Sequence, residues 1–286
     1  AYYNMDHESS VGMAYWGAVE YWGESNAWPK KGWNYSFFNH TMRPYPQAYL
    51  VRSAFKADEP LVHIGVIDRK GGESVSWNDV IVGRPAILDH WNFAAGTTQD
   101  VVTYTNARSV ELVVNGKSFG TQINDTTVKD KSQRNTIMWK NVPYGDGGSI
   151  EAIARDVDGR ETARHRIETA GRAVALRIEP ETTKWTADGM DLLYLNITAV
   201  DSRGRIVPTF DEELSVDITG AATFVAMDNG DHYTDSLFHG VTAKPMKGGR
   251  MQVILRSTRQ QGKVTVKVST AKLKQSYKTA TMNIRN

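Results

Sequence analysis

The aromatic side chains of this 286-residue chain are concentrated near its N-terminal end. Of its 8 Trp, 12 Tyr and 8 Phe residues, 13 fall within residues 1–50. Each aromatic ring buries a large area when it packs. Fifty residues cannot build a core large enough to enclose so many rings, because short segments bury too little of their surface. The pattern therefore predicts that the N-terminal segment belongs to a larger hydrophobic body.

The first 58 residues predict one strand, one loop and one helix. Residues 12–19 (GMAYWGAV) are apolar without alternation, as in a strand buried on both faces. Residues 20–43 predict an irregular loop. Residues 44–55 (PYPQAYLVRSAF) place apolar side chains at helical spacing after two prolines that suit a helix start. These elements have nothing to bury against, so residues 1–58 predict the last β/α unit of something larger.

Beyond residue 58 the pattern changes to short alternating segments separated by turns. Asn115-Gly116 is a strong hairpin signal, and residues 156–159 (DVDG) predict a second tight turn. We therefore expect an antiparallel β-sandwich over residues 59–171. A further set of about seven short strands predicts an immunoglobulin-like sandwich over residues 172–286. Its expected strands are residues 173–180, 191–200, 205–208, 213–218, 223–227, 251–257 and 263–269.

Composition excludes several classes of chemistry. The chain has no Cys, which excludes disulfides, Cys-ligated zinc and thiol catalysis. It has no apolar run of about 18 residues, so no membrane-spanning helix is expected. It opens at Ala1 without a signal peptide, and we expect a product cut from a longer protein. Hydrophobic and charged residues make up 40% and 23%, typical of a folded chain rather than a disordered one.

The C-terminal end is basic, with 11 Lys and Arg and no acidic residue after Asp235. Such a tail can bind nucleic acid or an anionic polymer. However, charges alternate with Val over residues 263–268, and no aromatic residues interleave to stack on bases. The pattern favours the solvated face of a strand, and no nucleic-acid partner is expected.

Two carboxylates lie among the aromatic residues of the N-terminal segment. Glu20 and Glu24 are four apart, beside Trp16 and Trp22. An acid and a nucleophile flanking a bond, beside aromatic platforms, suit glycoside chemistry. The alternative is a surface pair on a loop, and spacing alone does not decide between them.

Other polar constellations are weaker. The seven His residues show no metal-binding spacing, so neither a metal nor a cofactor is expected. His90-Trp91-Asn92 predicts a packed structural histidine. Residues 228–231 (DNGD) lack the full calcium-loop pattern and predict a turn.

Taken in order, these segments resemble the C-terminal part of glycoside hydrolase family 2 enzymes of the β-galactosidase type. The resemblance covers essentially the whole chain, and its motifs are specific through their order and spacing rather than singly. The matching segments are GMAYWGAVEYWGES (12–25), residues 30–55, HWNF (90–93), residues 102–120, residues 138–161, TAG (169–171) and residues 186–208.

The resemblance implies a TIM barrel with a retaining mechanism and two catalytic Glu residues. In the family these come from the fourth and seventh barrel strands, whereas this chain resembles the family from about the eighth strand onward. No catalytic residue is therefore expected in this chain, and the fragment alone is expected to be inactive. The implied partners are a carbohydrate substrate and an upstream barrel of the same protein, with no membrane partner and a homo-oligomer left open. The resemblance to this family favours a periplasmic or secreted location.

The resemblance also suggests substrate-binding residues. Trp16 matches the eighth-strand Trp that stacks on the bound sugar, although packing in the barrel core is an alternative. Glu20 and Glu24 match the acidic positions that follow, with site-lining or structural roles. Trp22, which lies between them, is also expected to bind substrate. Glu20 stands where many relatives have Asp, which leaves the sugar specificity open.

Two other functions remain open for the sandwiches. One is a carbohydrate-binding module with exposed Trp77, Trp91, Trp139 and Trp185 as the platform. The other is a structural role in which the sandwiches brace the barrel or a dimer.

Overall fold

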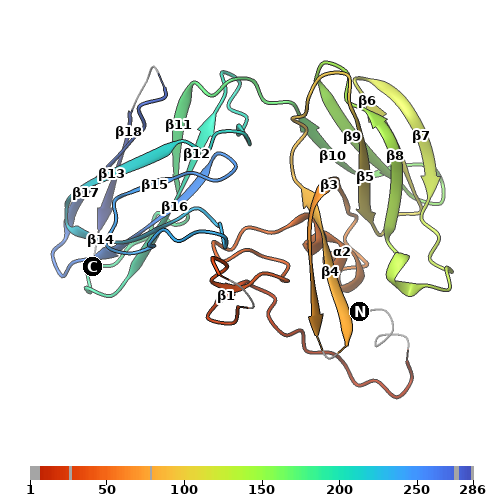
Figure 1. Ribbon diagram of the computed structural model, residues 1–286, viewed down its shortest axis with the longest axis horizontal. Helices are drawn as coiled ribbons and strands as arrows, with labels where there is room; N and C mark the ends of the chain where they lie inside the picture. The colour runs from red at the N-terminus through yellow and green to blue at the C-terminus, as the bar shows by residue number, and fades with distance from the viewer. Residues whose placement is uncertain (1–6, 26–27, 78, 274–276, 285–286) are drawn as a thin grey trace. The chain divides into compact units, whose positions relative to one another are not determined.

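The structure is a computed structural model that describes residues 7–25, 28–77, 79–273 and 277–284 (Figure 1). Tyr2 and Tyr3, which belong to the aromatic segment, lie outside the described residues. The chain forms two compact units. Unit 1 comprises Ala1–Tyr21 and Trp33–Thr169, and unit 2 comprises Trp22–Gly32 and Ala170–Asn286. Strands dominate both units, so the predicted mainly β fold is confirmed.

The predicted helix is present in unit 1 as α2 (Pro46–Phe55), with a proline in its first turn. It packs against the neighbouring strands β3 (Val62–Trp77), β4 (Val80–Leu88) and β5 (Thr98–Thr105). Its buried face carries Pro46, Ser53 and Ala54. Phe55, which we expected on the apolar stripe, is instead 52% exposed because it lies at the last helical position.

The strand predicted for residues 12–19 is not formed, so that prediction is wrong. Val11, Met13 and Trp16 are exposed. Backbone pairing starts only at Ala18, whose carbonyl accepts from the amides of Phe37 and Phe38. A strand needs a neighbour to take its backbone hydrogen bonds. Regular pairing then forms only the short strands β1 (Tyr21–Trp22) and β2 (Gly32–Trp33).

The rest of unit 1 is a β-sandwich of two four-stranded antiparallel sheets. One sheet has the order β4-β3-β5-β8 and the other β10-β9-β6-β7. The remaining strands are β6 (Ser109–Val114), β7 (Lys117–Ile123), β8 (Thr136–Pro143), β9 (Ser149–Arg155) and β10 (Glu161–Glu168), with a short 3-10 helix at Lys131–Gln133. The inner faces of both sheets form one core that includes Ile64, Leu112, Trp139 and Ile150.

The two predicted turns of unit 1 are confirmed. Asn115 and Gly116 have φ values of 50° and 77°, the left-handed geometry that a tight hairpin between β6 and β7 requires. The Asp156 carboxylate accepts from the amides of Asp158 and Arg160, each at 2.9 Å, and closes the hairpin between β9 and β10. Both turns follow from local chemistry, which is why the sequence predicts them.

Unit 2 contains a second sandwich, whose sheets have the orders β11-β12-β16-β14 and β15-β13-β17-β18. Its strands are β11 (Ala175–Pro180), β12 (Leu192–Val200), β13 (Glu213–Gly220), β14 (Ala222–Asp228), β15 (Ala243–Pro245), β16 (Arg250–Ser257), β17 (Gly262–Ser269) and β18 (Tyr277–Ile284). Six of the predicted strands are present, whereas β15 and β18 were not anticipated. The strand predicted for residues 205–208 is wrong, because this segment forms only an isolated bridge between Ile206 and Val200. Val264, Val266 and Val268 face the core and Lys263 and Lys267 are exposed, so the predicted solvated strand face is confirmed.

Candidate functional site

The four predicted substrate-binding residues fall in different units. Trp16 and Glu20 belong to unit 1, and Trp22 and Glu24 belong to unit 2. We describe the two pairs separately. The unit 1 pair lies on a tight bend that starts at Gly17, whose φ is 64°. A Cβ at Gly17 would lie 3.1 Å from the Tyr21 ring, so the backbone angle favours glycine and the packing leaves little room for a side chain.

Trp16 has an exposed ring whose orientation is set by a single hydrogen bond. The side chain is 79% exposed, and its indole Nε1 donates a hydrogen bond to the Tyr21 hydroxyl at 3.0 Å. Tyr21 in turn stacks on Trp33, with ring centroids 6.5 Å apart and planes 16° apart. An exposed, oriented aromatic ring suits stacking against the apolar face of a sugar.

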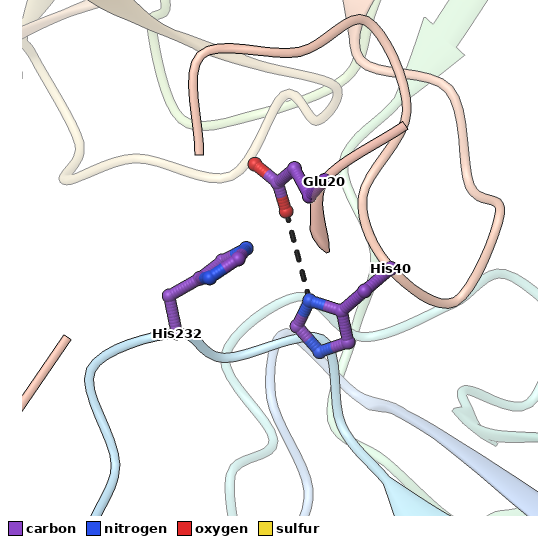
Figure 2. A group of neighbouring side chains, drawn as sticks. All are labelled: Glu20, His40 and His232. Atoms are coloured by element: carbon purple, nitrogen blue, oxygen red, sulfur yellow. Dashed lines mark ion pairs between the residues drawn. The ribbon is translucent and has the colours of Figure 1, made fainter. Parts of the chain in front are cut away.

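Glu20 of unit 1 is a buried carboxylate with polar partners. It is 3% exposed, and one carboxylate oxygen accepts from the Tyr45 hydroxyl at 2.9 Å. The other oxygen lies 3.7 Å from Nδ1 of His40, the ion pair drawn in Figure 2. His232, also drawn there, belongs to unit 2. Burial with two polar partners suits a carboxylate that holds the chain in place.

The loop that carries His40 is organised by Asn39. The Asn39 side-chain oxygen accepts from the Thr41 amide, the Thr41 hydroxyl and the Arg43 amide, at 2.9–3.1 Å. Met42 takes a left-handed φ of 60° to close the turn. Asn39 is 1% exposed, so its side chain serves the turn.

The other predicted pair lies on the unit 2 loop Trp22–Gly32. Trp22 is 41% exposed. Its ring centroid lies 4.6 Å from that of Phe238 and 5.3 Å from that of His232. Glu24 is exposed. The sequence identified Trp22 but gave no sign that it would pack on residues more than 200 positions away.

A half-buried ring stack in unit 1 escaped the sequence analysis. Tyr49 of α2 stacks on His63 of β3 at 3.6 Å between centroids, and His63 stacks on His165 of β10 at 4.2 Å. The Ile64 amide donates to Nδ1 of His165 at 3.0 Å, which keeps that nitrogen unprotonated. Burial, reinforced by His165, lowers the pKa of His63 to about 3, and burial also lowers the pKa of His165. The stack therefore favours neutral imidazoles.

The Trp residues considered as a glycan platform are mostly internal. Trp91, Trp139 and Trp185 are 0–4% exposed and belong to the sandwich cores. They therefore cannot form an exposed platform, and that expectation is wrong for these three. The Trp77 side chain lies outside the described part of the structure. Trp91 packs edge-on against Tyr144. His90, which we predicted to be a packed structural histidine, is half-buried, and its ring centroid lies 5.3 Å from that of Phe93.

Fold and candidate site together describe an aromatic segment that ends in helix α2, followed by two β-sandwiches. Residues 176–279 match the family glycoside hydrolase family 2 C-terminal domain 5, and residues 96–163 match a domain of unknown function, DUF4982. Residues 176–279 thus match a family 2 C-terminal domain, and the chain as a whole is similar to the C-terminal part of glycoside hydrolase family 2 proteins. The resemblance stated from the sequence is confirmed.

Two curated relatives and one solved structure illustrate the match. A β-galactosidase of Bacteroides ovatus is 27% identical over 84% of this chain and 27% of that protein. A β-glucuronidase of Formosa agariphila is 30% identical over 63% of this chain and 17% of that protein. A family 2 member from Bacteroides cellulosilyticus matches with a TM-score of 0.87 at 26% identity, over 99% of this chain and 37% of that one. This chain thus spans less than a third of the length of the curated relatives it matches.

Of the described helices, none has the length and apolar character needed to cross a lipid bilayer.

Proposed function

We propose that this chain is the C-terminal portion of a retaining exo-glycosidase that hydrolyses β-galactosides or related β-glycosides. The observation that carries the proposal is the similarity to β-galactosidases and β-glucuronidases, which in one relative extends over 84% of the chain. These named activities share the β-glycosidic bond and differ in the sugar. The proposal therefore commits to the bond and leaves the sugar open.

In this proposal the catalytic Glu pair lies upstream of the chain. A retaining glycosidase needs two carboxyl groups about 5–5.5 Å apart, one acid and one nucleophile. Glu20 suits neither task, because its carboxylate is buried and bonded to Tyr45. The residues of this chain would bind and orient the sugar without exchanging protons with it.

Trp16 would supply the main sugar contact. Its exposed ring offers an apolar face, and the bond to Tyr21 sets the ring plane before substrate arrives. A pre-oriented side chain avoids part of the ordering cost of binding. Glu20 would hold this segment through Tyr45 and His40, and Trp22 and Glu24 would line the site from the following loop.

Residues 59–171 and 172–286 would then brace the upstream barrel. We propose this structural role over a carbohydrate-binding module because Trp91, Trp139 and Trp185 are used in packing. The same proposal places the domain boundaries after residues 58 and 171.

Two proteins test the function: this chain and a longer protein that adds the upstream barrel. Both are assayed with nitrophenyl β-galactoside and nitrophenyl β-glucuronide. We expect turnover of at least one substrate by the longer protein and none by residues 1–286. Robust turnover by residues 1–286 alone would contradict the upstream placement of the catalytic pair. Inactivity of the longer protein on a panel of β-glycosides would contradict the enzyme class.

A further inference from the structure

The loop Trp22–Gly32 belongs to unit 2, although it continues the segment that carries Trp16 and Glu20. We propose that Phe238 of unit 2 is a positioning residue for Trp22, so that the C-terminal sandwich sets how tightly the substrate is held. The inference rests on the proposed function, because it needs Trp22 to contact the sugar or the group attached to it. It assigns the family 2 C-terminal domain a role in substrate affinity as well as in bracing.

Backbone contacts first attach the loop to the sandwich. The Gly23 amide donates to the Lys31 carbonyl at 3.0 Å and closes the loop. The Lys31 amide donates to the His232 carbonyl at 3.2 Å, and Lys30 forms an antiparallel bridge with Tyr233. The Lys31 ammonium donates to the Ser236 carbonyl at 2.7 Å. The two segments therefore lie side by side as a short ladder.

Phe238 is the side chain on which this attachment converges. Its ring lies 4.6 Å from the Trp22 ring, tilted by 45°. Two ammonium groups approach the same ring: Lys244 Nζ at 3.7 Å and Lys31 Nζ at 5.0 Å from its centroid. Both lie within the range of cation–π attraction. Phe238 thus links a loop residue to the body of the sandwich.

Lys244 anchors Phe238 to the sheet. It lies on β15, where it is paired with Leu214 of β13, and it is only 1% exposed. Its ammonium donates to the Leu237 carbonyl at 3.3 Å. A buried ammonium group needs compensating contacts. Loss of the cation–π contact between Lys244 and the Phe238 ring would therefore be unfavourable. A continuous series of contacts therefore runs from the sheet through Lys244 and Phe238 to Trp22.

This packing leaves Trp22 41% exposed. Part of its surface packs against Phe238 and His232, and the exposed part could contact a ligand. A ring held on one side presents a defined face on the other, and a sugar stacking on it finds its orientation already set. Removal of Phe238 should therefore weaken binding without touching the reacting atoms.

Loop attachment is tested first on this chain. Trypsin cleavage after Lys30 and Lys31 is timed by mass spectrometry in wild type, Phe238→Ala, Phe238→Tyr and Phe224→Ala. Phe224 is the matched control, since it is a half-buried Phe of the same sandwich that packs on the main core. We expect Phe238→Ala to speed loop cleavage by about 10-fold, because local opening controls access. Phe238→Tyr should resemble wild type. Equal loop cleavage in Phe238→Ala and Phe224→Ala would overturn the inference.

Substrate affinity is tested next in the longer protein that carries the barrel. Phe238→Ala should raise KM by about 10-fold while kcat changes by less than about 3-fold, the signature of lost binding rather than lost chemistry. The KM values of Phe238→Tyr and of Phe224→Ala should both equal that of the wild type.

The outcomes separate the two proposals. An active longer protein whose KM is unaffected by Phe238→Ala overturns this inference and leaves the proposed function standing. A longer protein without glycosidase activity overturns both, because a positioning role requires a substrate. A fall in kcat with constant KM also overturns the inference.

Discussion

At the scale of single residues, Trp16 is notable for being exposed and oriented at once. Its ring is 79% exposed, and Nε1 is bonded to Tyr21. In the longer protein we expect Trp16→Ala to raise KM for a nitrophenyl glycoside by about 10-fold or more, because stacking area is lost. Trp16→Phe keeps a ring but loses the bond to Tyr21, so its KM should be intermediate.

Trp28 is the matched control for this prediction, since it is 75% exposed and is not among the predicted site residues. Trp28→Ala should leave KM within about 2-fold of wild type. Equal effects of the two alanine substitutions would mean that exposure, rather than position, explains the result.

His63 makes a prediction about pH. Burial lowers its pKa to about 3, whereas an unfolded chain has a His pKa near 6.5. Between those values the unfolded state binds a proton that the folded state does not, so stability is full above pH 6.5 and falls as pH drops. The free energy of unfolding of unit 1 should decrease by up to about 1.4 kcal/mol per pH unit for this group.

Urea unfolding between pH 7.5 and 4.5 measures the effect. The groups that face His63 are Tyr49, His165 and Asp89. His63→Phe keeps an aromatic ring in the stack and should flatten the pH dependence, leaving the smaller slope of His165. Replacement of the exposed His239 by Gln should not change it. An unchanged slope in His63→Phe would contradict the assignment.

At the scale of elements, two turns with similar sequences carry different weight. Asp156 and Asp201 each open a D-x-x-G turn and accept two backbone amides. Asp201 is also 4% exposed and accepts from the Gly171 amide at 2.8 Å and from Arg205 Nε at 2.8 Å. Burial raises its pKa, but these hydrogen bonds outweigh burial and hold the pKa well below its usual range.

Asp201→Ala should therefore destabilise unit 2 by about 2–4 kcal/mol, because several donors lose their acceptor. Asp156→Ala removes a more exposed turn carboxylate and should cost about 1 kcal/mol or less. Chemical denaturation of both variants checks the difference. Equal losses would show that the tie to Gly171 and Arg205 adds nothing to the turn.

At the scale of the whole molecule, the chain has two separate hydrophobic cores. Leu112 belongs to the core of unit 1 and Leu195 to that of unit 2, and both are fully buried. Each Leu→Ala substitution should lower the free energy of unfolding of the unit that contains it by about 2–5 kcal/mol. Calorimetry should show Leu112→Ala lowering one transition and Leu195→Ala lowering another. A single transition shifted equally by both would contradict independent cores.

The N-terminal segment should be the least protected part of unit 1. Val11, Met13 and Trp16 are exposed, and pairing starts only at Ala18. Limited proteolysis should cut within residues 7–18 before it cuts the sandwich strands, because exposed unpaired backbone opens at little cost. Early cuts in β5 or β12 with an intact N-terminal segment would contradict this.

The sequence by itself determined the local features of this protein. Helix α2, the turn at Asn115-Gly116 and the alternating strand β17 follow from spacing and turn chemistry within a few residues. The same local reading failed for residues 12–19, because an apolar run becomes a strand only if a neighbour pairs with it. The order of motifs along the chain was enough to indicate the family.

Tertiary structure decided everything that depends on distant contacts. It buried Trp91, Trp139 and Trp185 while leaving Trp16 exposed. It stacked His63 on His165, and it packed Trp22 on Phe238. Burial and pairing depend on which segments meet in the folded chain, and residue spacing carries no information on that across one or two hundred positions.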